Sequence, residues 1–348
     1  MLQPGRRSSI PFSDRQPRIG LLGCTCPVGS SVRLSLALLA SALIVSACGA
    51  PPSKAGGAVG GAVISPSPSV STEIPSTPTP SPAPIPSPAP TAALPAPDEP
   101  IPSAPAALAA QLARTTAALD EAIHRWTTAG DPSAPNPPND VVLLALYQQR
   151  VYRYLARHPV VAGWTIRLLP RPLAGAAHDI ITAGHELFSI VRAAPSATAF
   201  KTQRPRPAGV LLGYFEEAQS RFGVSWEVLA VVNYIESKFG RVRSASYAGA
   251  QGPMQFIPST WAVYGLGGDV HDPHDAIMGA ANYLHASGAP RNYRAALFHY
   301  NRSWAYVNAV LLYAKRMAAD PRAYFAFYNW QVFVVTRSGD VRLTGPGR

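Results

Sequence analysis

The chain has 348 residues, of which 37 are proline, and its composition is uneven along its length. Hydrophobic residues make up 47% and charged residues 14%, which excludes a wholly disordered chain, and 27 glycines without a three-residue period exclude collagen. The net charge of +11 favours nucleic acid, an anionic membrane or an acidic polymer as partner, and three cysteines are too few for a disulfide framework.

The first clear signal along the chain is an apolar run of 14 residues from Leu34 to Ala47. It is shorter than the roughly 20 residues that a membrane-spanning helix needs, and it is typical of the apolar part of a signal peptide. Cys48 follows directly, and the sequence Val45-Ser46-Ala47-Cys48-Gly49 resembles the bacterial lipobox, whose cysteine is acylated. We therefore expect a signal peptide at residues 1–47 and lipidation at Cys48.

A proline-rich segment comes next, and we assign it to residues 48–105. Residues 51–105 contain 17 prolines and four charged residues, a composition that cannot bury a core. In polyproline II form it would extend about 3.1 Å per residue. The segment is therefore predicted to be a disordered tether between an acyl anchor and a folded part.

Three alanine-rich segments with helical periodicity follow, and they define a predicted helical accessory region at residues 106–200. The expected helices are Ala107–Thr128, Val141–Arg157 with Asp140 as its N-cap, and Leu173–Ala193. No chemical motif stands out in this region.

A second helical region begins with Val210–Phe222, which Gly223 is expected to end. Ser225 is the predicted N-cap of the next helix, which runs to Gly240. Three- and four-residue spacing places Glu236 on the same face as apolar residues of this helix. Burial against apolar groups raises the pKa of a carboxyl, as a general acid near neutral pH requires. The alternative is a surface glutamate paired with a nearby lysine or arginine.

The segment Ser246–Trp261 is predicted to be a shaped loop, because it combines Gly249 and Gly252 with two prolines. Within it, Gln255 can donate to and accept from amide and hydroxyl groups. Many aromatic residues follow, and a cleft lined with aromatic rings suits the apolar faces of sugars. These residues are Trp261, Tyr264, Tyr283, Tyr293, Phe298, Tyr300, Trp304 and Tyr306.

The stretch Gly267–Ala276 contains aspartates and histidines that are possible metal ligands. We instead expect Asp272 or Asp275 to cap a helix over Ala276–His285, and we expect no metal. Further helix is predicted over Trp304–Ala319. The β-branched alternation of Tyr328–Thr344, around Ser338-Gly339-Asp340, predicts a C-terminal β-hairpin.

Three motifs occur in order: Glu236-Ser237, then Gly249–Gln255 (GAQGPMQ), then Tyr300-Asn301. Together they resemble the successive motifs of the lytic transglycosylases, which have a lysozyme-like fold and cleave bacterial peptidoglycan. The resemblance covers roughly residues 210–317. The sequence departs from the family pattern at Pro253, where leucine is usual, at His299, where alanine is usual, and at Arg302-Ser303, where many members have Ala-Gly.

The resemblance implies a mainly α fold with a lysozyme-like catalytic domain, here placed at residues 201–322, and a C-terminal extension at residues 323–348. It makes Glu236 the sole catalytic carboxylate and Ser246, Gln255 and Tyr300 contacts of substrate or intermediate. Asn301 would shape the cleft. No cofactor is implied, because the substrate's own acetamido and C6 hydroxyl groups complete a reaction that yields 1,6-anhydromuramoyl products.

Two alternatives remain open at this stage. One is a hydrolytic muramidase, which would normally need a second carboxylate from Asp269, Asp272 or Asp275. The other is a non-catalytic peptidoglycan-binding lipoprotein. The expected partners are peptidoglycan strands and, through the anchor, a membrane; export argues against nucleic acid, and we expect a monomer. The expected location is the outer face of the cytoplasmic membrane or, in a host with two membranes, the outer membrane.

Overall fold

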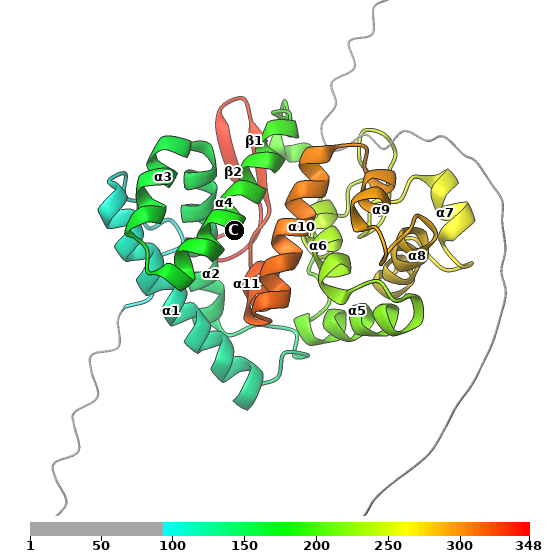
Figure 1. The fold of residues 1–348 in the computed structure, drawn as a ribbon, viewed down its shortest axis with the longest axis horizontal. Helices are drawn as coiled ribbons and strands as arrows, with labels where there is room; N and C mark the ends of the chain where they lie inside the picture. Colours follow the sequence, from blue (N-terminus) through cyan, green and yellow to red (C-terminus); the bar gives the residue numbers. More distant parts are fainter. Residues whose placement is uncertain (1–92) are drawn as a thin grey trace, which may run out of the picture. The chain divides into compact units, whose positions relative to one another are not determined.

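The computed structural model describes residues 93–348 (Figure 1). This part is mostly helical, with 11 α-helices, one 3-10 helix and one antiparallel pair of strands, which confirms the predicted fold class. The signal peptide, Cys48 and most of the tether lie outside the described residues. The helices are α1 (Pro105–Ala129), α2 (Asn139–Arg157), α3 (Pro159–Leu168), α4 (Arg171–Ile190), α5 (Ala208–Phe222), α6 (Trp226–Ser237), α7 (Pro258–Tyr264), α8 (Pro273–Ala286), α9 (Tyr293–Tyr300), α10 (Trp304–Ala319) and α11 (Arg322–Tyr328). The 3-10 helix is η1 (Ala197–Ala199), and the strands are β1 (Phe333–Thr336) and β2 (Gly339–Arg342).

The first four helices pack together and reach the second half of the chain through α4. Helix α1 contacts α2 and α3, and α4 lies between α2 and α10. In α1, Leu108, Leu112, Leu119 and Ile123 are fully buried, because three- and four-residue spacing places them on one face. The predicted accessory region thus shares a core with the second helical region.

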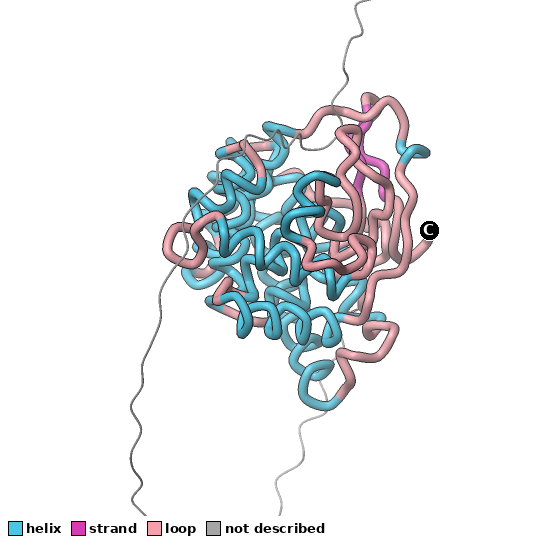
Figure 2. Tube along the Cα trace, turned by 90° about the vertical axis from the view of Figure 1, so that its right-hand side faces the viewer, coloured by secondary structure: helices cyan, strands magenta, loops and turns pink. Residues whose placement is uncertain are grey.

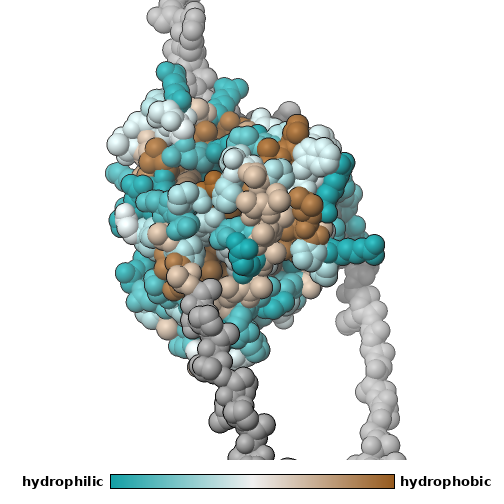
Figure 3. All heavy atoms as spheres, turned by 90° about the vertical axis from the view of Figure 1, so that its left-hand side faces the viewer, coloured by the Kyte–Doolittle hydropathy of each residue, from teal (hydrophilic) through white to brown (hydrophobic). Residues whose placement is uncertain are grey.

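Helix α3 was not predicted, and its composition explains why. Its sequence is apolar on nearly all sides, so it lacks the polar face that makes a surface helix recognisable. Val160, Trp164 and Leu168 are exposed, and the Arg167 guanidinium lies 4.8 Å above the Trp164 ring. Figure 3 shows apolar and polar side chains mixed on the side of the molecule that α1 and α3 form.

Several predicted boundaries are wrong, among them the following three. Asp140 is the second residue of α2 rather than its N-cap, a position that Pro138 takes, and Asp140 instead binds the Val141 amide and Arg125. Helix α6 ends at Ser237 instead of Gly240, because the residues from Lys238 to Gly240 all have positive φ. The hairpin turn is at residues 337–338, since Thr336 already pairs with Gly339.

Helix α6 lies in the middle of the second half of the chain. It packs against α5, α8, α10 and α11, and every residue from Val228 to Ile235 is buried. Gly223 ends α5 in the left-handed conformation, as predicted, with φ of 69°. Asp272 caps α8 by accepting hydrogen bonds from the His274 and Asp275 amides, also as predicted.

The hairpin and the residues just before it contact α2. The side chain of Gln149 on α2 exchanges two hydrogen bonds with the backbone of Gln331, of 2.9 and 2.8 Å. Asp340 on β2 accepts hydrogen bonds from Arg153 and Arg157 of α2. Figure 2 shows that the strands and the long loops gather on the same side of the helices.

The residues before α1 contact the helical part. Arg150 on α2 donates to the carbonyl oxygens of Pro97 and Glu99, and the Tyr147 hydroxyl donates to that of Pro100. The folded part therefore begins before residue 106, where we placed the boundary of the tether. Between residues 93 and 348, no helix is long and apolar enough to cross a bilayer.

Candidate active site

Glu236 lies in the last turn of α6, one residue before the helix ends. The predicted face is formed as expected: Leu229 and Val232 are fully buried, and Asn233 is 1% exposed. Glu236 itself is half-buried, so it keeps contact with solvent while its carboxyl group is largely removed from water. It occupies the boundary between the core and the surface.

The pKa of Glu236 is raised to about 7, chiefly because burial disfavours the ionised form. The Tyr306 hydroxyl and the charge of Lys238 act in the opposite direction. The Tyr306 hydroxyl is buried and lies near the carboxyl. A carboxyl with this pKa is both an acid and a base near neutral pH.

The loop after α6 is fixed to the helix that carries Glu236. The carbonyl oxygen of Pro253 accepts hydrogen bonds from Asn233 Nδ2 at 2.8 Å and Ser237 Oγ at 2.5 Å. The Tyr300 hydroxyl donates to the carbonyl oxygen of Met254 at 2.7 Å. The three motifs of the sequence are thus joined by hydrogen bonds to one short stretch of backbone.

Glycine is required at one position of this loop. Gly252 has φ of 71°, and a Cβ there would overlap the carbonyl oxygen of Val270. Gly249 has φ of 79° but open space around it. Gln255 also has positive φ, at 50°, and its side chain donates to the carbonyl oxygen of Gly252 at 3.0 Å. The backbone path of the loop therefore depends on the residues that the motif specifies.

The other predicted site residues lie close to this loop. Ser246 closes its first turn, because its hydroxyl accepts from the Ala250 amide and its own amide donates to the Ala250 carbonyl oxygen. Tyr300 is 6% exposed, and burial is the main reason why its pKa is raised. The charge of the nearby Glu236 carboxylate raises the pKa of Tyr300 further. Asn301 is buried and ends α9. No hydrogen bond joins Ser246 or Gln255 to Glu236 within the described residues.

The comparisons with known proteins agree with this geometry. The family described as "Transglycosylase SLT domain" matches residues 213–320, the part of the chain that contains all three motifs. We refer to the matched residues 213–320 as the SLT domain. The chain is also 33% identical over 82 residues to membrane-bound lytic murein transglycosylase F of Thiobacillus denitrificans. The match covers 24% of this chain and 17% of that protein, and no solved structure matches the chain.

A cavity of about 170 Å³ lies beside Glu236, and most of its lining comes from outside the SLT domain. Helices α2 and α4, the segment before η1 and strand β1 provide its walls, and the end of α6 completes it. Glu236 is the only carboxylate among the lining residues. Figure 1 shows α2, α4 and the hairpin on one side of α6 and α10, and α7, α8 and α9 on the other.

Lys238 lies at the same end of the cavity, two residues beyond Glu236 in the chain. Its Nζ donates to the Tyr234 carbonyl oxygen at 3.0 Å and lies 4.1 Å above the Tyr234 ring. Burial, and then the charge of Arg153, lower its pKa to about 7, although Glu236 acts to raise it. The alternative of a surface glutamate in an ion pair is not favoured, because Glu236 is half-buried and forms no ion pair with Lys238, Arg241 or Arg243 among residues 93–348.

Sequence reasoning missed two residues of this site, Tyr306 and Arg153. Tyr306 was one of many aromatic residues, and nothing in its spacing singled it out. Arg153 is 83 residues before Glu236 in the chain, in a helix that carries no motif. The packing of α4 against α10 and the ion pair between Arg153 and the hairpin help to bring that helix to the site.

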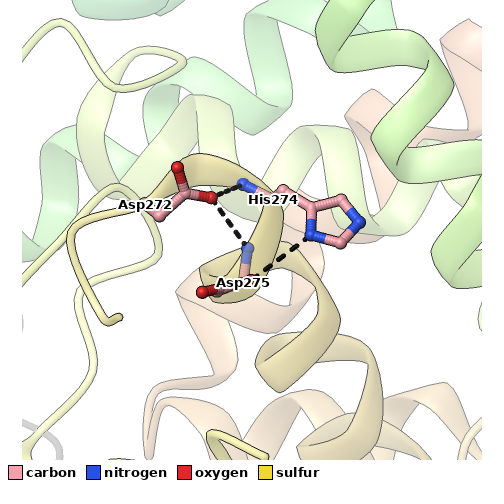
Figure 4. A group of neighbouring side chains, drawn as sticks. All are labelled: Asp272, His274 and Asp275. Carbon is pink, nitrogen blue, oxygen red and sulfur yellow. Dashed lines mark hydrogen bonds and ion pairs between the residues drawn. The ribbon is translucent and has the colours of Figure 1, made fainter. Parts of the chain in front are cut away.

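A possible metal cluster lies away from Glu236. Ligand atoms of Asp272, His274 and Asp275 are within 4.8 Å of one another (Figure 4). Asp272 caps α8, and Asp275 Oδ2 accepts from the Asp269 amide at 2.9 Å. The two ring nitrogens of His274 face Asp275 and Glu217 at 3.3 and 3.1 Å. Hydrogen bonds within the protein account for this arrangement.

Proposed function

We propose that the protein cleaves the bond between N-acetylmuramic acid and N-acetylglucosamine in peptidoglycan by intramolecular transglycosylation. The observation that carries the proposal is the half-buried Glu236, whose pKa is about 7, at the end of a central helix in an SLT domain. The name of the relative from Thiobacillus denitrificans states the same activity for that protein.

Glu236 would act twice in the reaction. In its neutral form it donates a proton to the glycosidic oxygen while the acetamido oxygen of the muramic acid attacks the anomeric carbon. The resulting carboxylate then takes the proton of the C6 hydroxyl, and the C6 oxygen bonds to the anomeric carbon as the bond between that carbon and the acetamido oxygen breaks. The products are a 1,6-anhydro sugar and a free sugar end, and no water is consumed. A carboxyl poised near pH 7 suits both steps.

The motif loop would hold the substrate. Ser246, Gln255 and Tyr300 are assigned to contacts with substrate or intermediate, and Asn301 to the shape of the cleft. The hydrogen bonds of Pro253 and Met254 to α6 and α9 fix the loop relative to Glu236, which favours a preorganised site.

The aspartates on which a hydrolytic mechanism would depend are engaged elsewhere. Asp269 accepts from the His271 amide at 2.8 Å, Asp272 caps α8, and Asp275 binds the Asp269 amide. None of them lines the cavity beside Glu236. This arrangement favours a mechanism with one carboxylate.

Anchoring is a separate part of the proposal. Acylation of Cys48 and a tether of polyproline type would hold the enzyme at the outer face of a membrane and let it reach the wall at a distance. Metabolic labelling with a radioactive fatty acid tests it: the native chain should be labelled, and a Cys48→Ser chain should not.

Digestion of purified sacculi tests the activity. The protein lacking residues 1–48 should release muropeptides that carry the anhydro sugar, which are lighter by one water than hydrolytic products. Glu236→Gln should release none, and Glu227→Gln, a change in the first turn of the same helix, should leave digestion intact. Products of hydrolytic mass would point to a muramidase, and intact sacculi with the unaltered protein would point to a binding protein.

A further inference from the structure

The cavity beside Glu236 has a chemical character that the three motifs do not explain. Apolar side chains from outside the SLT domain form most of it, among them Ile180, Leu187 and Ile190 of α4 and Val334 of β1. Because Glu236 lines it as well, a ligand group placed there is next to the reacting bond. The accessory helices and the hairpin therefore contribute directly to the site.

The size of the cavity restricts what can enter it. An apolar cavity of about 150 Å³ holds one benzene molecule, and this cavity measures about 170 Å³. An N-acetylhexosamine with its substituents is much larger than benzene. The cavity is thus matched to a small side group of the glycan strand rather than to another sugar of it.

Charge restricts the ligand further. Two cations line the cavity without an ion pair among residues 93–348: Lys238 beside Glu236, and the exposed Arg192 just after α4. A third cation, Arg153, is already neutralised, since its Nε and Nη2 lie 3.1 and 2.6 Å from Asp340. Apolar walls combined with two basic side chains that form no ion pair within the described part of the chain suit a ligand that has methyl groups and carboxylates, because a carboxylate bound there would also favour the charged form of Lys238.

We propose that this cavity binds the lactyl group and the first, alanyl residue of the stem peptide of the muramic acid whose bond is cleaved, with the acidic residue that follows at the cavity's edge. The inference rests on the proposed function for the identity of the sugar. In peptidoglycan the lactyl group is joined to the sugar ring that Glu236 acts on, so a pocket adjoining the carboxyl is where this group lies. The lactyl and alanyl methyl groups meet the apolar walls, and the peptide carboxylates meet Lys238 and Arg192.

The walls of the cavity are held in place for such a role. Asp340 ties the hairpin to α2 through two arginines, and the Arg153 guanidinium lies over the rings of Phe188 and Phe333 at 5.0 and 4.7 Å. The Ala194 amide donates to the carbonyl oxygen of Val335 at 2.8 Å. The pocket is therefore built before the substrate arrives, which reduces the entropy lost on binding.

Binding of small fragments tests the proposal without any cleavage. By titration calorimetry, the full chain in detergent should bind N-acetylmuramoyl dipeptide more tightly than N-acetylmuramic acid. Arg192→Ala, a surface change, should reduce that preference by about two- to fivefold, as expected for an exposed charge. Lys238→Asn, which keeps a residue that tolerates positive φ, should reduce it by about tenfold or more. Arg221→Ala on α5, away from the cavity, is the matched control.

Cleavage gives an independent measurement. The ratio of kcat/KM for strands with stem peptides to kcat/KM for strands stripped of them by an amidase should exceed one, and both cavity variants should lower it. Equal affinity for the two fragments, or a preference that neither variant changes, overturns the proposal. Failure of the unaltered protein to cleave either strand, with fragment binding still dependent on Arg192, would reject the proposed function and leave the binding site in place.

Discussion

Replacing Glu236 by glutamine should remove activity and, at the same time, stabilise the fold. In the folded protein burial raises the pKa of this carboxyl from 4.5 to about 7. The ionised form therefore lowers the free energy of unfolding, and the penalty grows as the pH rises from about 4.5 to about 7. Glutamine stays neutral and carries no such penalty.

The size of the effect follows from the two pKa values. One pKa unit corresponds to 1.36 kcal/mol, so the difference between 4.5 and about 7 is worth about 3 kcal/mol at pH 8 and less than about 1 kcal/mol at pH 5. For a folded part of this size, about 3 kcal/mol raises Tm by roughly 6–12 °C. The sign is fixed: the advantage of Glu236→Gln over the unaltered protein should increase with pH.

Urea unfolding at pH 5, 6, 7 and 8 measures this difference, and any constant effect of the new amide cancels when the pH values are compared. Glu227→Gln is the matched control, since it removes a carboxylate from the first turn of α6, where the helix dipole stabilises it by about 0.3–1 kcal/mol. That variant should be slightly less stable. An advantage for Glu236→Gln that is the same at pH 5 and pH 8 would refute the idea that the carboxyl is held in a desolvated position.

Three further changes test other parts of the structure. Gly252→Ala should destabilise the protein by more than about 2 kcal/mol and impair cleavage, because strain at positive φ adds to overlap with the Val270 carbonyl oxygen. Gly249→Ala is the control: its new methyl group meets open space, so thermal unfolding should show only the backbone strain of about 1 kcal/mol. Asp340→Asn should lower stability by about 1–3 kcal/mol at pH 7 by leaving a buried arginine unpaired. Since its arginine partners hold the pKa of Asp340 below its usual range despite burial, that deficit should disappear in acid, below the native pKa. Tyr300→Phe should cost about 1 kcal/mol and reduce kcat, because the motif loop loses a 2.7 Å hydrogen bond; unchanged urea unfolding and kcat would contradict this.

Local signals in the sequence predicted much of the second half of the chain. The bounds of α10 are those expected from periodicity, and Gly223 and Asp272 end and begin their helices as their residue types favour. Ser225 takes the predicted N-cap position, but its side chain makes no capping bond, and the Trp226 amide binds Gln219 instead. The preference of a residue type for the N-cap therefore predicts where a helix begins more reliably than it predicts which group accepts hydrogen bonds from the first amides of the helix.

Contacts between distant segments could not be predicted in this way. Gln149 and Gln331 pair through buried hydrogen bonds, but a glutamine on an amphipathic helix carries no signal that names a partner 182 residues away. The same is true of Asp340 with Arg153. The accessory region and the hairpin were therefore assigned no chemistry, although they form most of the cavity beside Glu236.

Two opposing effects on the pKa of Glu236 meet at the C-terminal end of α6. The C-terminal end of a helix carries partial negative charge, which favours a neutral carboxyl and acts in the same direction as burial. Lys238 opposes both, and it can do so because its left-handed backbone, with φ of 55°, turns Nζ back to the Tyr234 carbonyl oxygen. Asparagine tolerates this backbone without the charge.

Lys238→Asn should therefore raise the pKa of Glu236 and move the alkaline limb of the pH profile of kcat/KM to higher pH, because the reaction begins from the neutral carboxyl. Lys238→Ala should show the same displacement together with roughly 1–2 kcal/mol of lost stability from the strained backbone. If the limb stays where it is in both variants, the charge of Lys238 does not act on the catalytic carboxyl, and the poise of Glu236 between acid and base would have to come from Tyr306 alone.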